Sequence, residues 1–340
     1  MSIFRRKQQG DAPVAVRHTL TPVEAIRAHK LPAARVVPGD GDAVLADLIK
    51  AAKVRDWPTM RATLAGYSGY DLTALAANVF QASPEMDDWL PEAVGADTED
   101  PIARFALGAR KVERGWEIRS GLRAVHVSQD QFKAFHAHLR SAEEYLYEAA
   151  ALDRTSPAPW YYLMMSARGL QMGIPVTKRR FEAIVTRSPG HLGAHRQMLQ
   201  SLCKKWSGSH EQMHAFATEA MRGPHGLKLG ELAPIAHLER WLDLASDARR
   251  AYMTSQPVRT ELLEAAERSV FHPDFAMPRA PVAAYNIFAM AFHLAGLHEQ
   301  ARIAFKATGG IVTRFPWMYI NGADQVAPYT KAREISFRTA

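Results

Sequence analysis

The sequence predicts an all-α protein, built as an irregular solenoid of paired helices. Apolar residues recur at spacings of three and four along most of the 340 residues, whereas the alternating β-branched runs that mark strands are almost missing. Hydrophobic residues make up 47% of the chain and charged residues 23%, which is the composition of a folded protein with a large core. Similar helix–turn–helix segments also follow one another in the second half, so we expect helix pairs that cover each other's apolar faces.

The chain divides into four predicted regions. Residues 1–20 are a flexible basic N-terminus, and residues 21–120 a degenerate N-terminal helical region. Residues 121–325 hold the helical repeats, and residues 326–340 are a C-terminal tail.

Capping residues mark the helix starts. The segment 21–24 reads Thr-Pro-Val-Glu, Asp100 precedes a proline, and Ser128 stands three residues before Gln131 in a capping box. Regular apolar stripes follow the last two starts. The first stripe is Ile102, Phe105, Ala106, Ala109, Val112 and Trp116, and the second is Phe132, Phe135, Leu139, Ala142, Tyr145, Leu146 and Ala149. We expect the second of these helices to exceed twenty residues.

The repeats follow this long helix. Pro157 and Pro189, 32 residues apart, each lie in a Ser-Pro turn between two helical segments. The clearest pair covers residues 282–309, with a turn at Gly296, and the segment 57–80 is a degenerate earlier pair. Their order of aromatic, alanine, turn glycine, alanine and aromatic resembles tetratricopeptide repeats, whose period is about 34 residues. That resemblance implies a concave groove for a peptide or protein, and it places Trp160, Tyr161 and Tyr162 in the core and along the groove.

Composition limits the compartment and the partners. Cys203 is the single cysteine, which excludes an internal disulfide and favours the cytoplasm, and no apolar run approaches the length of a membrane span. The net charge is +7, yet residues 62–103 contain no Lys or Arg. The basic cluster 178–180 with Arg187 is a nucleic-acid candidate. A solvated helix face is the preferred interpretation, so nucleic acid is disfavoured as a partner.

The segment 205–217 contains His-Glu-x-x-His. In zinc peptidases two such histidines bind one ion and the glutamate polarises its water, which would make His210 and His214 zinc ligands and Glu211 the catalytic base. The extended form of the motif is absent, because Ala217 and Ala220 occupy its glycine and histidine positions.

The third ligand of such a zinc site is the weak point of this hypothesis. Glu231 and Glu239 are the downstream carboxylate candidates, but neither lies in a motif of a known zinc peptidase. A zinc-dependent hydrolase is therefore the alternative function, with zinc as its cofactor.

A structural interpretation accounts for the same segment without metal. Ser209 caps a helix, Gln212 completes a capping box, and Gly208 makes the preceding turn. The buried stripe of this helix is Met213, Phe216, Ala217 and Ala220.

This segment also resembles a sequence pattern of a family of uncharacterised bacterial helical-repeat proteins. The pattern is Lys-Trp-Gly-Gly-Ser-x-x-x-Met-x-x-Phe-Ala, and Ser207 departs from it. The matching positions are Lys205, Trp206, Gly208, Ser209, Met213, Phe216 and Ala217. The resemblance implies structural roles for these residues and supplies no activity, so we expect a non-catalytic, cofactor-free scaffold that binds a protein or peptide.

Overall fold

The computed structural model describes residues 31–95, 99–120, 127–206, 208–277, 279 and 281–338. Within these ranges the regular elements are helices, and a single isolated β-bridge joins Arg35 to Ile311. The predicted all-α class is therefore confirmed. The basic N-terminus, the predicted helix start at residues 21–24 and Ser207 lie outside the described residues.

The helices are short and follow one another closely. In chain order they are η1 (Pro38–Gly41), α2 (Ala43–Lys53), α3 (Trp57–Ala65), α4 (Gly69–Ala82), η2 (Pro84–Asp88), α5 (Leu90–Val94), α6 (Pro101–Arg119), α7 (Gln129–Leu152), α8 (Ala158–Gly169), α9 (Ile174–Arg187), α10 (Leu192–Leu202), α11 (His210–Arg222), α12 (Gly226–Leu229), α13 (Leu232–Asp243), α14 (Ser246–Met253), α15 (Gln256–Glu267), α16 (Pro281–Leu294), α17 (His298–Ala307), α18 (Arg314–Trp317) and α19 (Val326–Arg338).

The predicted caps form. The carboxylate of Asp100 accepts the amide of Ile102 at 3.0 Å, and Ser128 and Gln131 make both hydrogen bonds of the capping box. Helix α7 runs for 24 residues, as its pattern predicts. Helices α6 and α7 pack against each other, and the rings of Trp116 and Phe135, one from each stripe, lie 4.9 Å apart. Phe105 of the first stripe instead packs against Phe80 of α4 and Tyr162 of α8.

The predicted helix pairs are also present. Helices α3 and α4 contact each other, and so do α16 and α17. The helices on either side of the two Ser-Pro turns, α7 with α8 and α9 with α10, are also in contact. Gly296 turns the chain between α16 and α17 with φ of 69°, and the inward residues Ala301 and Phe305 are buried.

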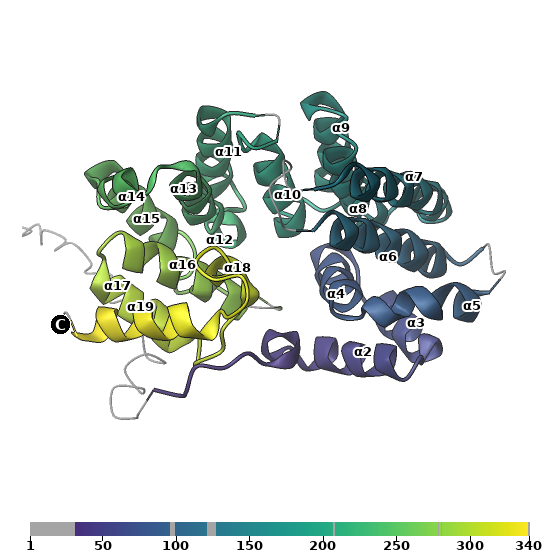
Figure 1. Cartoon of the computed structure of the whole chain (residues 1–340), viewed down its shortest axis with the longest axis horizontal. Coiled ribbons are helices and arrows are strands. Elements are labelled where there is room, and N and C mark those ends of the chain that lie inside the picture. The colour runs from purple at the N-terminus through teal and green to yellow at the C-terminus, as the bar shows by residue number, and fades with distance from the viewer. Residues whose placement is uncertain are drawn as a thin grey trace, which may run out of the picture.

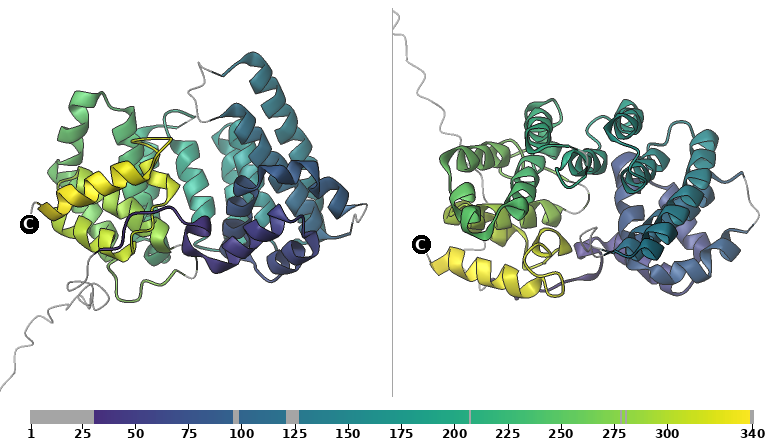
Figure 2. Two further views of the ribbon diagram at one scale, coloured as in Figure 1. Left: turned by 60° about the horizontal axis from the view of Figure 1, so that its bottom comes forward. Right: turned by 45° about the horizontal axis from the view of Figure 1, so that its top comes forward.

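The helices follow an arc whose two ends meet (Figure 1). The extended segment before α2 passes beside α19 in both Figure 1 and Figure 2. The amide of Arg35 donates to the carbonyl of Gly310 at 2.9 Å, and the amide of Val312 donates to Arg35 at 2.9 Å. Arg279 adds an ion pair with Asp42 at 2.6 Å. The first described segment thus fastens the C-terminal helices to the N-terminal ones.

The segment assigned above to a C-terminal tail is a packed helix. Tyr329, Ala332 and Ser336 recur at spacings of three and four, and all three are buried where α19 contacts α16 and α17. The hydroxyl of Tyr329 hydrogen-bonds that of Thr308 at 2.6 Å. The stripe is short and includes a serine, so its periodicity alone is a weak signal.

Some carboxylates of the acidic segment 62–103 form ion pairs with arginines outside it. Arg110 is buried and forms bidentate pairs with Asp87 and Glu117, at 2.8 to 3.1 Å. Arg61 pairs with Asp100 at 2.6 Å. At these positions the acidic residues of the segment therefore pair with arginines of the same chain.

Candidate functional site

The His-Glu-x-x-His segment forms the start of α11, with Ser209 as its cap. The hydroxyl oxygen of Ser209 accepts the amide of Gln212 at 3.2 Å, as predicted. Glu211 is exposed in the first turn. Nε2 of His210 lies 3.0 Å from Oδ2 of Asp243, whereas Nε2 of His214 lies 3.4 Å from the hydroxyl of Tyr252. The two histidines therefore have different partners.

Neither downstream carboxylate considered as a third zinc ligand is hydrogen-bonded to His214. Glu231 is buried and pairs with Arg196 at 2.5 Å. Glu239 is buried and pairs with Lys205 at 2.7 Å. His214 instead lies beside His237 and Glu261, which the motif does not include.

A cavity of about 970 Å³ lies beside the start of α11. It is bordered by the end of α8, the end of α10, the turn 203–206, the end of α13 and residues 318–319. Its apolar lining includes Phe132, Phe135, Trp206, Met213, Met318 and Tyr319. Helices α8, α10, α11 and α13 follow in this order along the arc, and the segment after α18 comes from its C-terminal part (Figure 1).

Arg168 forms part of the cavity wall, where its guanidinium lies against two indole rings that also contact each other. Its guanidinium carbon lies 5.1 Å from the ring centre of Trp116 and 5.5 Å from that of Trp206. One amino group donates to the side chain of Gln197 at 2.5 Å. Burial lowers the pKa of Arg168 to about 10, so the side chain stays charged at neutral pH. Stacking of this kind stabilises a partly desolvated cation.

Glu239 joins several sides of the same cavity. Its carboxylate accepts hydrogen bonds from the amide of Gln200, the ammonium group of Lys205 and the hydroxyl of Tyr319. These donors come from α10, from the turn before α11 and from the segment after α18. A buried carboxylate satisfied by three donors fixes those elements relative to α13.

The cavity lining carries more positive than negative charge. Its cationic residues are Arg119, Arg168, Lys204, Lys205 and Arg249, and its carboxylates are Glu239 and Asp243. Cys203 also borders the cavity, but its thiol lies 3.4 Å from the sulfur of Met213, and burial raises its pKa to about 12. The thiol is therefore protonated at neutral pH and is a core group, as the sequence indicates.

The residues of the family pattern build one side of this cavity. Lys205, Trp206 and Met213 line it directly. At Gly208 an added Cβ would lie 2.1 Å from the carbonyl oxygen of Leu202, so the turn before α11 requires glycine. Ala217 is buried and Phe216 is half-buried.

The sequence places Trp160, Tyr161 and Tyr162 in the core and along a groove. Tyr161 and Tyr162 are buried in the core, and Tyr162 has 0% of its surface exposed. Trp160 is half-buried, and its ring lies 5.7 Å from the guanidinium of Arg187. None of the three borders the cavity. Tyr161 and Tyr162 are thus core residues, and groove lining stays a prediction for Trp160.

The basic cluster of α9 contains both buried and exposed side chains. Arg180 points inward, where it pairs with Glu143 at 2.8 Å and donates to the carbonyl of Leu163. Lys178 and Arg179 remain exposed. The cluster therefore does not present one continuous basic face.

Sequence reasoning missed Arg168, the central role of Glu239 and the contribution of Tyr319. Nothing local distinguishes these residues, since their contacts join positions far apart in the chain.

None of the helices formed by the described residues combines the length and apolar character needed to traverse a bilayer. Comparisons with protein-family models, curated proteins and solved structures find no match.

Proposed function

We propose that this protein is a non-catalytic, helical-repeat scaffold that binds a segment of another protein or a peptide in the cavity beside α11. The observation that carries the proposal is the lining of that cavity, where aromatic and sulfur-containing side chains surround an excess of cations. Pockets of this size with a few placed polar groups are typical binding sites.

The chemistry favours a peptide with an acidic group next to an apolar side chain. An acidic group would meet Arg168 and Lys204 on the cavity lining, and an apolar side chain would contact Phe132 and Met318. The arginine is held against two indole rings before any ligand arrives, which limits the ordering cost of binding.

Two resemblances stated above agree with this proposal. The pairs at 142–206 and 282–309 resemble tetratricopeptide repeats, which bind peptides along their inner face. Lys205 and Trp206 of the bacterial helical-repeat pattern line the cavity. A hydrolase, in contrast, would need His210 and His214 to share an ion, whereas their hydrogen bonds go to different partners.

Selection of displayed random peptides on the full-length protein tests the proposal. We expect enriched sequences that contain Asp or Glu near an aromatic or aliphatic residue. Their affinity should fall at least tenfold in Lys204→Glu and in Phe132→Ala. The matched control is Lys331→Glu, an exposed charge reversal on α19 that should leave affinity unchanged. Peptides without acidic residues, or affinities that all three variants preserve, would refute the proposed site.

A further inference from the structure

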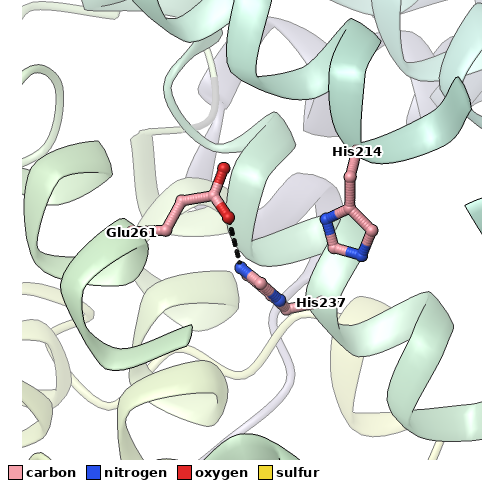
Figure 3. A group of neighbouring side chains, drawn as sticks. All are labelled: His214, His237 and Glu261. Atoms are coloured by element: carbon pink, nitrogen blue, oxygen red, sulfur yellow. Dashed lines mark hydrogen bonds and ion pairs between the residues drawn. The ribbon is translucent and has the colours of Figure 1, made fainter. Parts of the chain in front are cut away.

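Three helices bring two imidazoles and a carboxylate together outside the cavity lining. His214 comes from α11, His237 from α13 and Glu261 from α15, and one ligand atom of each lies within 4.8 Å of the others. Figure 3 shows the ring of His214 directed toward the pair formed by His237 and Glu261.

A chain of hydrogen bonds orients the group. Nε2 of His237 lies 2.9 Å from Oε2 of Glu261, and Nδ1 of His237 lies 2.7 Å from the hydroxyl of Tyr252. The same hydroxyl lies 3.4 Å from Nε2 of His214, and the hydroxyl of Thr218 donates to Oε1 of Glu261 at 2.6 Å. Tyr252 therefore holds the nitrogen of each imidazole that would face away from a shared ion.

We propose that His214, His237 and Glu261 form a binding site for a divalent transition-metal ion, with zinc as the best fit to two nitrogens and one oxygen. Such a set leaves a fourth position for water in tetrahedral zinc. His214 would bind through Nδ1 and His237 through Nε2, because Tyr252 engages the opposite nitrogens.

The required rearrangement is small. Ligand atoms at about 2.0 to 2.1 Å from a tetrahedral ion lie roughly 3.3 Å apart. The His237 and Glu261 atoms, at 2.9 Å, already approach that separation, and side-chain rotation can draw in His214 from at most 4.8 Å. The ion replaces the proton between His237 and Glu261, and His237 then carries its proton on Nδ1, toward Tyr252.

This site differs from the one that the pentapeptide predicts. It shares His214 with that motif but uses neither His210 nor Glu211, and its other ligands lie on separate helices. The bound ion would connect α11, α13 and α15, so its effect is first of all structural. Because binding to the folded chain alone stabilises it, zinc should raise the unfolding temperature.

Titration of the untagged full-length protein with Zn²⁺ alone tests the proposal, with Co²⁺ as a spectroscopic probe. We expect one ion per chain, visible Co²⁺ absorption of a four- or five-coordinate site, and a higher unfolding temperature with Zn²⁺. His237→Ala and Glu261→Gln should weaken binding at least 100-fold. Tyr252→Phe, which keeps all three ligands, should weaken it by about 10-fold or more.

His210→Ala and Glu211→Gln are the matched controls and should leave zinc affinity unchanged. Circular dichroism of each variant without metal establishes that it is folded, and Glu261→Gln preserves the shape of the side chain it replaces. Absence of stoichiometric zinc binding by the wild-type protein would overturn the proposal. So would zinc binding that survives in folded Glu261→Gln and His237→Ala, or that is lost in His210→Ala.

Discussion

Glu113 offers the sharpest test of how the core is built. It lies on α6 with 5% of its surface exposed, one turn from Arg110. Arg110 is already paired with Asp87 and Glu117, so its charge is largely satisfied by other carboxylates. Burial therefore dominates, and it raises the pKa of Glu113 to about 8, although Arg110 acts in the opposite direction.

The size of the effect follows from linkage. The ordinary pKa of this carboxyl is 4.5, so the folded chain holds a proton up to about pH 8 that the unfolded chain releases above 4.5. The contribution to stability is fully present below pH 4.5 and is lost as pH rises toward 8. At pH 7 the loss amounts to about 3 kcal/mol, of which roughly 2.5 kcal/mol accrues above pH 5.

Glu113→Gln removes the titration while preserving shape. We expect the free energy of unfolding of this variant, relative to the wild type, to increase by about 2 to 3 kcal/mol between pH 5 and pH 7. Urea unfolding followed by circular dichroism at a series of pH values measures the difference. Other titrating groups are common to both proteins and cancel.

Glu117→Gln is the comparison variant, one turn further along α6. Burial opposes ionisation of Glu117, but its hydrogen bonds from Arg110 and Arg114 prevail and lower its pKa. Its own contribution to stability is lost only as pH falls below 4.5, but its negative charge helps to raise the pKa of Glu113. Glu117→Gln should therefore reduce the loss of stability between pH 5 and pH 7 in the same direction as Glu113→Gln. If Glu113→Gln shows a constant difference from the wild type, Glu113 is ionised in the folded protein and the reasoning is refuted.

Three further predictions concern single positions. Gly208→Ala should cost about 2 to 4 kcal/mol of stability, because its Cβ meets backbone at 2.1 Å, whereas Gly322→Ala in open space should be neutral in the same urea assay. Cys203 should react with maleimide roughly 1,000-fold more slowly in the native protein than in urea at pH 7; a similar rate would contradict its raised pKa. Arg180→Met should cost about 3 to 5 kcal/mol by stranding Glu143, and exposed Arg179→Ala less than 0.5; equal losses would contradict the buried pair.

The parts of the fold that the sequence predicts are those encoded locally. Asp100, Ser128 and Ser209 cap helices because a side-chain oxygen needs only an amide two or three residues away. The stripes of α6 and α7 are likewise repeated at short spacing. The helix at residues 326–338 was missed because a buried serine replaces an apolar residue in its stripe.

The sites depend on contacts that no short segment contains. In the sequence Arg168 is an ordinary arginine near a helix end. Its contacts with Trp116 of α6 and Trp206 of the turn before α11 appear only in the structure. Glu239 was a candidate metal ligand by residue type alone, and its donors come from three other segments. His237 and Glu261 have no local motif, so only the packing of α13 and α15 reveals them.

The geometry of α11 explains why the His-Glu-x-x-His segment contains one proposed metal ligand, His214, but not the others. Met213 and His214 are neighbours in sequence, and successive residues of a helix point about 100° apart. Met213 therefore faces the cavity, while His214 faces His237 and Glu261. On α13, Glu239 and His237 divide in the same way between the cavity and the histidine cluster. Helices α11 and α13 therefore separate the cavity, which Met213 and Glu239 border, from the cluster of His214, His237 and Glu261.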